Sequence, residues 1–174
     1  MDSAAADNGV GPLVEEATKK AAVAWLAVPG GSRALPAWCA WFGGALYVVT
    51  GPGEQEVPGL TAADSAVVTI RGDHGGRIVS WPATASRLPP DGDEWDTIAP
   101  QLAARRLNAS GTAEQVVVRW AAECVITRLT PTGDAADAGR SMPDGSLAAP
   151  PPPSSATSAT RLPFRLHRIG RPPA

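Results

Sequence analysis

The sequence has few of the residues that form metal sites, and it carries little charge. Among its 174 residues are two Cys and two His, and 18% of the residues are charged. The Cys and His residues lack the spacings that are typical of zinc sites, and the chain contains neither a P-loop nor a GxSxG nucleophile motif. A formal net charge of -2 is also unlike the basic balance of nucleic-acid-binding domains. We therefore expect no metal and no nucleic-acid partner.

Long hydrophobic runs are missing as well. The run AAVAWLAV that follows Lys19 and Lys20 has eight residues, which is too short to span a bilayer. An acidic stretch precedes this run and no convincing cleavage site follows it, so the run lacks the pattern of a signal peptide. Cys39 and Cys124 lie within apolar runs, which predicts buried thiols in a reducing compartment, although the spacing leaves a disulfide between them open. These features predict a cytoplasmic protein without membrane insertion.

Glycine and proline are abundant, with 18 of each, and their distribution divides the chain into three parts. Residues 1–11 are small and polar and are expected to be disordered. Residues 134–174 are rich in Pro, Ala and Ser and end in an Arg-rich stretch. We expect them to form a flexible linker and a basic C-terminal tail. The tail is either disordered, docked onto the folded part, or in contact with a membrane surface, a nucleic acid or an acidic partner. The folded domain is therefore predicted at residues 12–133.

Short runs of apolar and β-branched residues, separated by turn signals, dominate this domain. They predict strands at residues 22–28, 34–42, 45–50, 66–71 and 77–88, with a two-residue hairpin turn at Gly43-Gly44. The run QVVVRWAAECVITRL, from Gln115 to Leu129, is predicted to form one long last strand, either straight or bent. Because the strands follow one another as hairpins rather than as βαβ units, they predict a small antiparallel barrel of about six strands.

Helical signals are fewer. Pro12 suits the first turn of a short helix, and the stretch after Pro58 suits a single helical turn. The clearest helix runs from Asp91 to Leu107, where acidic residues gather at the start and Arg residues at the end, as the helix dipole favours. Its apolar stripe consists of Trp95, Ile98, Ala99 and Leu102. We expect this to be the one helix inserted before the last strand.

Two of the six Trp residues lie in the predicted second strand. Trp38 and Trp41 are an odd number of residues apart, so in a regular strand their side chains face opposite sides of the sheet. One of them is expected to pack inside the barrel. For the other Trp residue two roles remain open: it packs at an interface, or it stacks on a cofactor.

The order of these motifs is similar to that of a known family. Pro36 to Thr50 reads P-x-W-x-x-W-x-G-G-x-L-Y-V-V-T, and a loop of five or six residues leads from there to Val57 and Leu60. With AWLAV before it and QVVVRWAAECVITRLTP at the end, the pattern resembles the pyridoxamine 5'-phosphate oxidase-like split β-barrels, which bind FMN or deazaflavin. The resemblance covers about two thirds of the chain. It implies a split barrel that is mainly β with helices, a homodimer, and a flavin- or deazaflavin-dependent oxidoreductase.

The resemblance also implies where the cofactor would lie. The flavin is expected against the backbone of the second and third strands, at Trp38 and Cys39 and from Val49 to Gly51. Thr50 matches the position of a hydroxyl that contacts the phosphate, and Arg77 lies near a position where a polar side chain approaches the flavin ring. No residue stands out as a catalytic acid or base.

The loop after the third strand departs from the family pattern. Gln55 and Glu56 stand where an Arg-Lys pair or a single Lys is typical. A carboxylate close to a phosphate is repulsive by about 1 to 4 kcal/mol, and a missing charged hydrogen bond removes about 1.5 to 3 kcal/mol more.

Two hypotheses follow from this departure. In the first, the protein is a flavin enzyme whose phosphate is bound by another residue, for which Arg33, Arg71 and Arg77 are candidates. In the second, the barrel has lost the cofactor and serves as a dimeric binding or structural module. Thr50 and the Gly-Pro-Gly loop favour the first hypothesis, whereas Gln55 and Glu56 favour the second.

Overall fold

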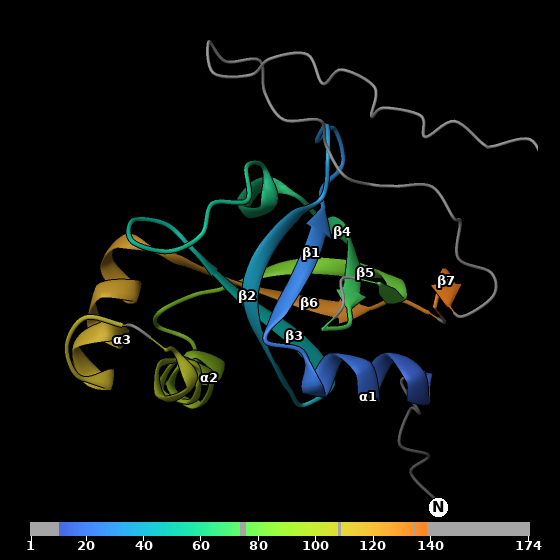
Figure 1. The fold of residues 1–174 in the computed structure, drawn as a ribbon. Coiled ribbons are helices and arrows are strands. Elements are labelled where there is room, and N and C mark those ends of the chain that lie inside the picture. The colour runs from blue at the N-terminus through green and yellow to red at the C-terminus, as the bar shows by residue number, and fades with distance from the viewer. Residues whose placement is uncertain (1–10, 74–75, 108, 134, 139–174) are drawn as a thin grey trace, which may run out of the picture.

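A computed structural model describes residues 11–73, 76–107, 109–133 and 135–138 (Figure 1). Within these ranges the protein is mainly β with helices, as the sequence predicted. The expected disordered N-terminus and nearly all of the expected linker and tail lie outside the described residues, so those assignments stay predictions.

Six antiparallel strands form a closed barrel. Their order is β4-β1-β2-β3-β6-β5, and β5 pairs with β4 to complete the ring (Figure 1). The split barrel expected from the sequence is thus confirmed. A two-residue strand, β7, pairs with β5 within the stretch that was expected to be linker. The strands are β1 (Val23–Ala27), β2 (Leu35–Phe42), β3 (Ala45–Thr50), β4 (Ser65–Arg71), β5 (Arg77–Leu88), β6 (Val125–Pro131) and β7 (Asp137–Ala138).

The helices lie at two places around the barrel. Helix α1 (Pro12–Lys20) packs against β2 and β5, whereas α2 (Asp93–Arg105) and α3 (Ala113–Glu123) lie side by side on another side of the barrel (Figure 1). A short 3₁₀ turn, η1 (Leu60–Ala62), follows the loop after β3, where a single helical turn was predicted. No helix in the described ranges is long and apolar enough to cross a membrane.

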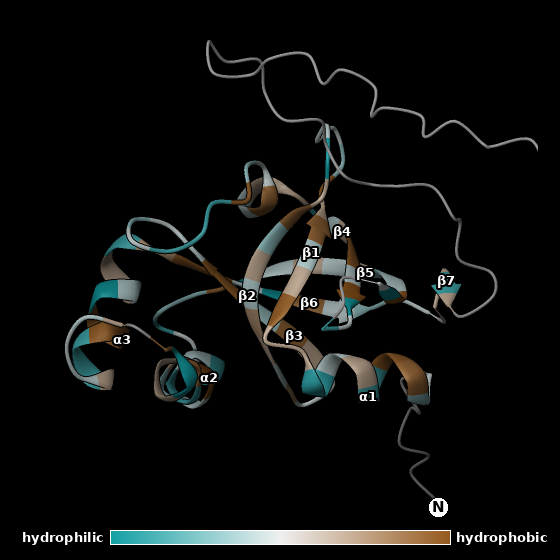
Figure 2. Ribbon diagram, in the orientation of Figure 1, coloured by the Kyte–Doolittle hydropathy of each residue, from teal (hydrophilic) through white to brown (hydrophobic). Residues whose placement is uncertain are grey.

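Strand alternation produces two hydrophobic cores. The first fills the barrel, where the rings of Trp41 and Trp81 meet edge to face with centroids 6.1 Å apart. The second lies between the outer surface of the barrel and helices α2 and α3, and contains Trp95 and Trp120. Trp38 packs against this second core, so Trp38 and Trp41 do face opposite sides of β2. Figure 2 shows hydrophobic segments on the strands and hydrophilic ones on α2 and α3.

The prediction of one long strand from Gln115 to Leu129 was wrong in its first half. Residues 113–123 form α3, so two helices rather than one lie between β5 and β6. Thr112 starts the helix with a capping box: its hydroxyl accepts from the Gln115 N–H at 3.3 Å, and Gln115 Oε1 accepts from the Thr112 N–H at 3.0 Å. Val116 and Trp120 lie one turn apart and are both buried. The cap and this apolar pair outweigh the β-propensity of the valines.

The first turn of α2 is attached to the barrel wall by a polar contact. Tyr47 on β3 donates to Glu94 Oε1 at 2.6 Å, and Arg128 on β6 donates to both oxygens of the same carboxylate at 3.1 and 3.3 Å. Burial raises the pKa of Tyr47 to about 12, and the hydrogen bond to Glu94 makes the second largest contribution. The phenol therefore stays neutral and donates. This contact helps to set the position of α2, and Arg106 directly follows the last residue of that helix.

Candidate functional site

The loop after β3 begins with a tight turn, Gly51-Pro52-Gly53-Glu54. The Glu54 N–H donates to the Gly51 carbonyl at 3.0 Å, and Pro52 followed by a residue with positive φ, Gly53 at 79°, is typical of a type II turn. Gly51 itself has a φ of 139°, and a Cβ there would lie 2.9 Å from Cys124 Cα. The two glycines therefore allow the loop to pass close to the start of β6 and to turn Glu54 toward the helices.

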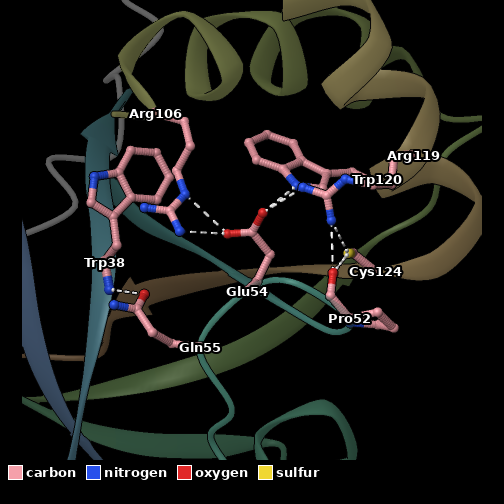
Figure 3. Close-up of polar contacts among 8 residues, drawn as sticks. All are labelled: Trp38, Pro52, Glu54, Gln55, Arg106, Arg119, Trp120 and Cys124. Atoms are coloured by element: carbon pink, nitrogen blue, oxygen red, sulfur yellow. Dashed lines mark hydrogen bonds and ion pairs between the residues drawn. The ribbon is translucent and has the colours of Figure 1, made fainter. Parts of the chain in front are cut away.

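The Glu54 side chain lies in the centre of a polar cluster between the loop and the two helices (Figure 3). Its Oε2 accepts from Nε and Nη2 of Arg106, both at 3.0 Å. Its Oε1 accepts from Arg119 Nη2 at 2.8 Å and from Trp120 Nε1 at 2.9 Å. The Glu54 side chain is only 3% exposed. We call these four residues, Glu54, Arg106, Arg119 and Trp120, the Glu54 cluster.

Gln55 turns the other way and contacts β2. Its Oε1 accepts from the backbone N–H of Trp38 at 2.8 Å (Figure 3). The guanidinium of Arg106 lies over the ring of the same Trp38, with Cζ 5.3 Å from the ring centroid. The Trp38 backbone, where a flavin was expected, thus already has a hydrogen-bond partner from its own chain.

Thr50 lines an open hollow of about 350 Å³. Thr50 is 6% exposed, and its hydroxyl has no hydrogen-bond partner among the described residues. Glu56 and Glu123, both exposed, contribute carboxylates to the lining, and none of the described residues that line the hollow is basic. A phosphate in this hollow would face two negative charges and no cation, which is unfavourable. The complete lining is Thr50, Gly51, Glu56, Val57, Pro58, Gly59, Thr61, Glu123 and Val125.

The remaining predicted site residues lie elsewhere. Cys39 is buried in the barrel core, and this burial raises the pKa of its thiol to about 12. Val49 is buried in the core beneath α2 and α3. Arg77 is the first residue of β5, and Leu88 is the last. Leu88 pairs with Ile126 of β6, which follows Val125, the residue that pairs with Thr50. The Leu88 end of β5, and not the Arg77 end, therefore lies near Thr50. Within one chain the structure brings Trp38 to Gln55, and Thr50 and Gly51 to Glu56, but it does not bring Arg77 to Thr50.

The sequence pattern does not reveal the partners of Glu54. Arg106 has the pattern of a favourable charge near a helix end, and the predicted strand contains Arg119 and Trp120, whose adjacent side chains would face opposite ways in a strand. On a helix the two residues can both reach one carboxylate, as they do here. The signal that could have revealed them is Thr112-x-x-Gln115, which marks the start of α3.

Comparisons with solved structures show the fold that this chain shares. It is similar to HutZ, the heme storage protein from Vibrio cholerae, with 14% identity, a TM-score of 0.51, and coverage of 69% of this chain and 88% of that one. It is also similar to a candidate pyridoxamine 5'-phosphate oxidase from Listeria innocua, with 15% identity and a TM-score of 0.48. The match covers 68% of this chain and 90% of that one. A FAD-binding protein from Mesorhizobium loti matches at 18% identity, TM-score 0.43, and 67% and 86% coverage.

No family model matches the sequence, and neither does any curated protein. At these levels of identity the structural likeness shows the split-barrel fold and no more.

The contrast between Glu54 and Glu56 gives a first prediction. Glu54→Gln removes a buried charge that faces two guanidinium groups, and we expect it to lower the free energy of unfolding by about 3 kcal/mol. Glu56→Gln, on an exposed carboxylate two residues later, should change it by less than about 0.5 kcal/mol. Urea unfolding followed by far-UV circular dichroism measures both. Equal effects of the two substitutions would contradict the structural role given to Glu54.

Proposed function

We propose that the protein is a cytoplasmic, dimeric split barrel that acts as a binding or structural module and does not hold a flavin by its phosphate. The observation that carries this proposal is the direction of the loop after β3. Glu54 does not belong to the described lining of the Thr50 hollow and binds Arg106 and Arg119, and Glu56 adds a carboxylate to the hollow itself. In the loop for which the family resemblance implied phosphate binding, Glu54 and Gln55 thus contact other residues of the same chain.

The expected cofactor does not fit the residues that are present. A flavin phosphate needs several donors or cations, whereas the described lining of the Thr50 hollow offers the hydroxyls of Thr50 and Thr61, two carboxylates and no cation. Arg106 and Arg119 both bind Glu54, and the Trp38 N–H binds Gln55. We therefore derive no reaction step through a flavin.

A flavin- or deazaflavin-dependent oxidoreductase is the second candidate function, and one observation favours it. The Thr50 hydroxyl is buried and lacks a partner among the described residues, while Thr50 and Gly51 line the same hollow. A buried hydroxyl without a partner is costly, and a ligand in the hollow could supply that partner. In such an enzyme the bound cofactor performs hydride transfer, and the protein positions it.

The state of the cysteines supports the cytoplasmic location. Cys39 and Cys124 are both free thiols and both buried, and each is the only cysteine of its core. Burial raises the pKa of both thiols, which keeps them protonated and unreactive. Buried, reduced thiols are typical of proteins in a reducing compartment.

Absorbance and flavin titration separate the two candidate functions. We expect the purified protein to be colourless and to leave the fluorescence of added FMN or deazaflavin unchanged at micromolar concentrations. Glu56→Lys should then increase the affinity for FMN at least about tenfold, because it replaces a repulsive charge by an attractive one at the hollow. Glu114→Lys, an equal charge change at the exposed start of α3, is the matched control.

Two results would decide against this account. Near-stoichiometric flavin in the purified protein would favour the oxidoreductase. No effect of Glu56→Lys on the FMN affinity would mean that residue 56 does not face a phosphate.

The proposed dimer rests on an apolar surface of the barrel. The outward positions of β1, β4 and β5 leave Val23, Val67 and Ile78 exposed at 44%, 42% and 38%. The register places Val67 beside Ala27 of β1 and Pro82 of β5, so these three residues are neighbours. Val23 and Ile78 lie four residues from Ala27 and Pro82 along the same strands, on the same face of the sheet. An exposed apolar face of this kind is typical of a protein–protein interface, and a second copy of the chain fits the homodimer that the resemblance implied.

Light scattering tests the dimer. We expect a dimeric mass for the wild type at micromolar concentrations and a monomeric mass for Val67→Asp, which places a charge in the apolar face. Val118→Asp is the control, since Val118 is also exposed, at 70%, but lies on α3. A wild-type monomer, or equal effects of both substitutions, would contradict the proposed interface.

A further inference from the structure

The partners of Glu54 have the composition of an oxyanion site. Arg106 donates twice to one carboxylate oxygen, and Arg119 and Trp120 donate to the other. Four N–H donors from three side chains thus converge on a single carboxylate (Figure 3). Guanidinium groups bind carboxylate and phosphate through such paired hydrogen bonds. Two guanidinium groups face one carboxylate here, so the cluster carries an excess of one positive charge.

A second hollow lies beside this cluster and leads to it from the solvent. Its volume is about 390 Å³, and Arg106 and Arg119 belong to its lining together with Gly53, Ser110 and Glu123. The side chains of the two arginines are 19% and 31% exposed, whereas that of Glu54 is 3% exposed. A small anion could therefore reach both guanidinium groups if the Glu54 side chain were absent.

We infer that Arg106, Arg119 and Trp120 form a binding site for a small carboxylate or phosphate, and that the Glu54 carboxylate is its resident ligand. Because Glu54 is part of the same chain, its effective concentration at the site is on the order of millimolar or higher. Free anions at lower concentrations do not displace it. This inference goes beyond the proposed module function, since it identifies an anion site and the group that fills it.

Removal of the internal ligand tests this site. In Glu54→Ala we expect acetate and phosphate to raise Tm in a saturable manner by a few degrees, relative to sodium chloride at the same ionic strength. Wild type and Glu56→Ala should show only the small general effect of these salts on stability.

A double variant shows whether the response comes from this site. Glu54→Ala combined with Arg119→Ala should lose the saturable response to acetate. If Glu54→Ala alone does not fold in chloride, refolding in acetate or phosphate should restore the folded protein, and refolding in chloride of equal ionic strength should not. The inference is wrong if neither anion stabilises or refolds Glu54→Ala more than chloride does. It is equally wrong if the double variant responds as the single one does.

Discussion

A carboxylate that is removed from water must be supplied with hydrogen-bond donors and opposite charge by the protein, and this constraint determines how the loop after β3 is built. Glu54 is 3% exposed, and its oxygens receive donors from Arg106, Arg119 and Trp120. These donors belong to α3 and to the residue that follows α2. The loop can therefore adopt this position only when both helices are packed on the barrel. Breaking such a pair by removing one partner leaves a buried charge and is strongly destabilising.

The same constraint bears on the hollow at the end of β3. A dianionic phosphate bound there would need several donors or cations. In this chain the nearby arginines are directed to an internal carboxylate, and the hollow at Thr50 has Glu56 and Glu123 in its lining. The hollow where the family resemblance predicted a phosphate is thus lined by carboxylates and, among the described residues, by no cation. Gln55 accepts a hydrogen bond from the Trp38 N–H, at a backbone position where the family resemblance predicted the flavin.

Much of the barrel could be predicted from the sequence because it depends on local signals. The alternation in β2 separated Trp38 from Trp41, and Gly43-Gly44 fixed the hairpin between β2 and β3. The run from Gln115 was predicted to be a strand because its valines have high β-propensity, whereas the capping box at Thr112 starts a helix there. That error hid the site as well. Arg119 and Trp120 meet at one carboxylate only on a helix, and Glu54 and Arg106 are 52 residues apart in the sequence, so no local pattern joins them.

The most direct test of this account is the coupling energy between Glu54 and Arg106. It is obtained from a double-mutant cycle of Glu54→Ala, Arg106→Ala and the double variant, with the free energy of unfolding measured in urea. We predict a coupling of at least about 1.5 kcal/mol, as for close charge pairs that are shielded from water. A coupling below about 0.5 kcal/mol, which is usual for exposed ion pairs or independent sites, would contradict the central role of the Glu54 cluster.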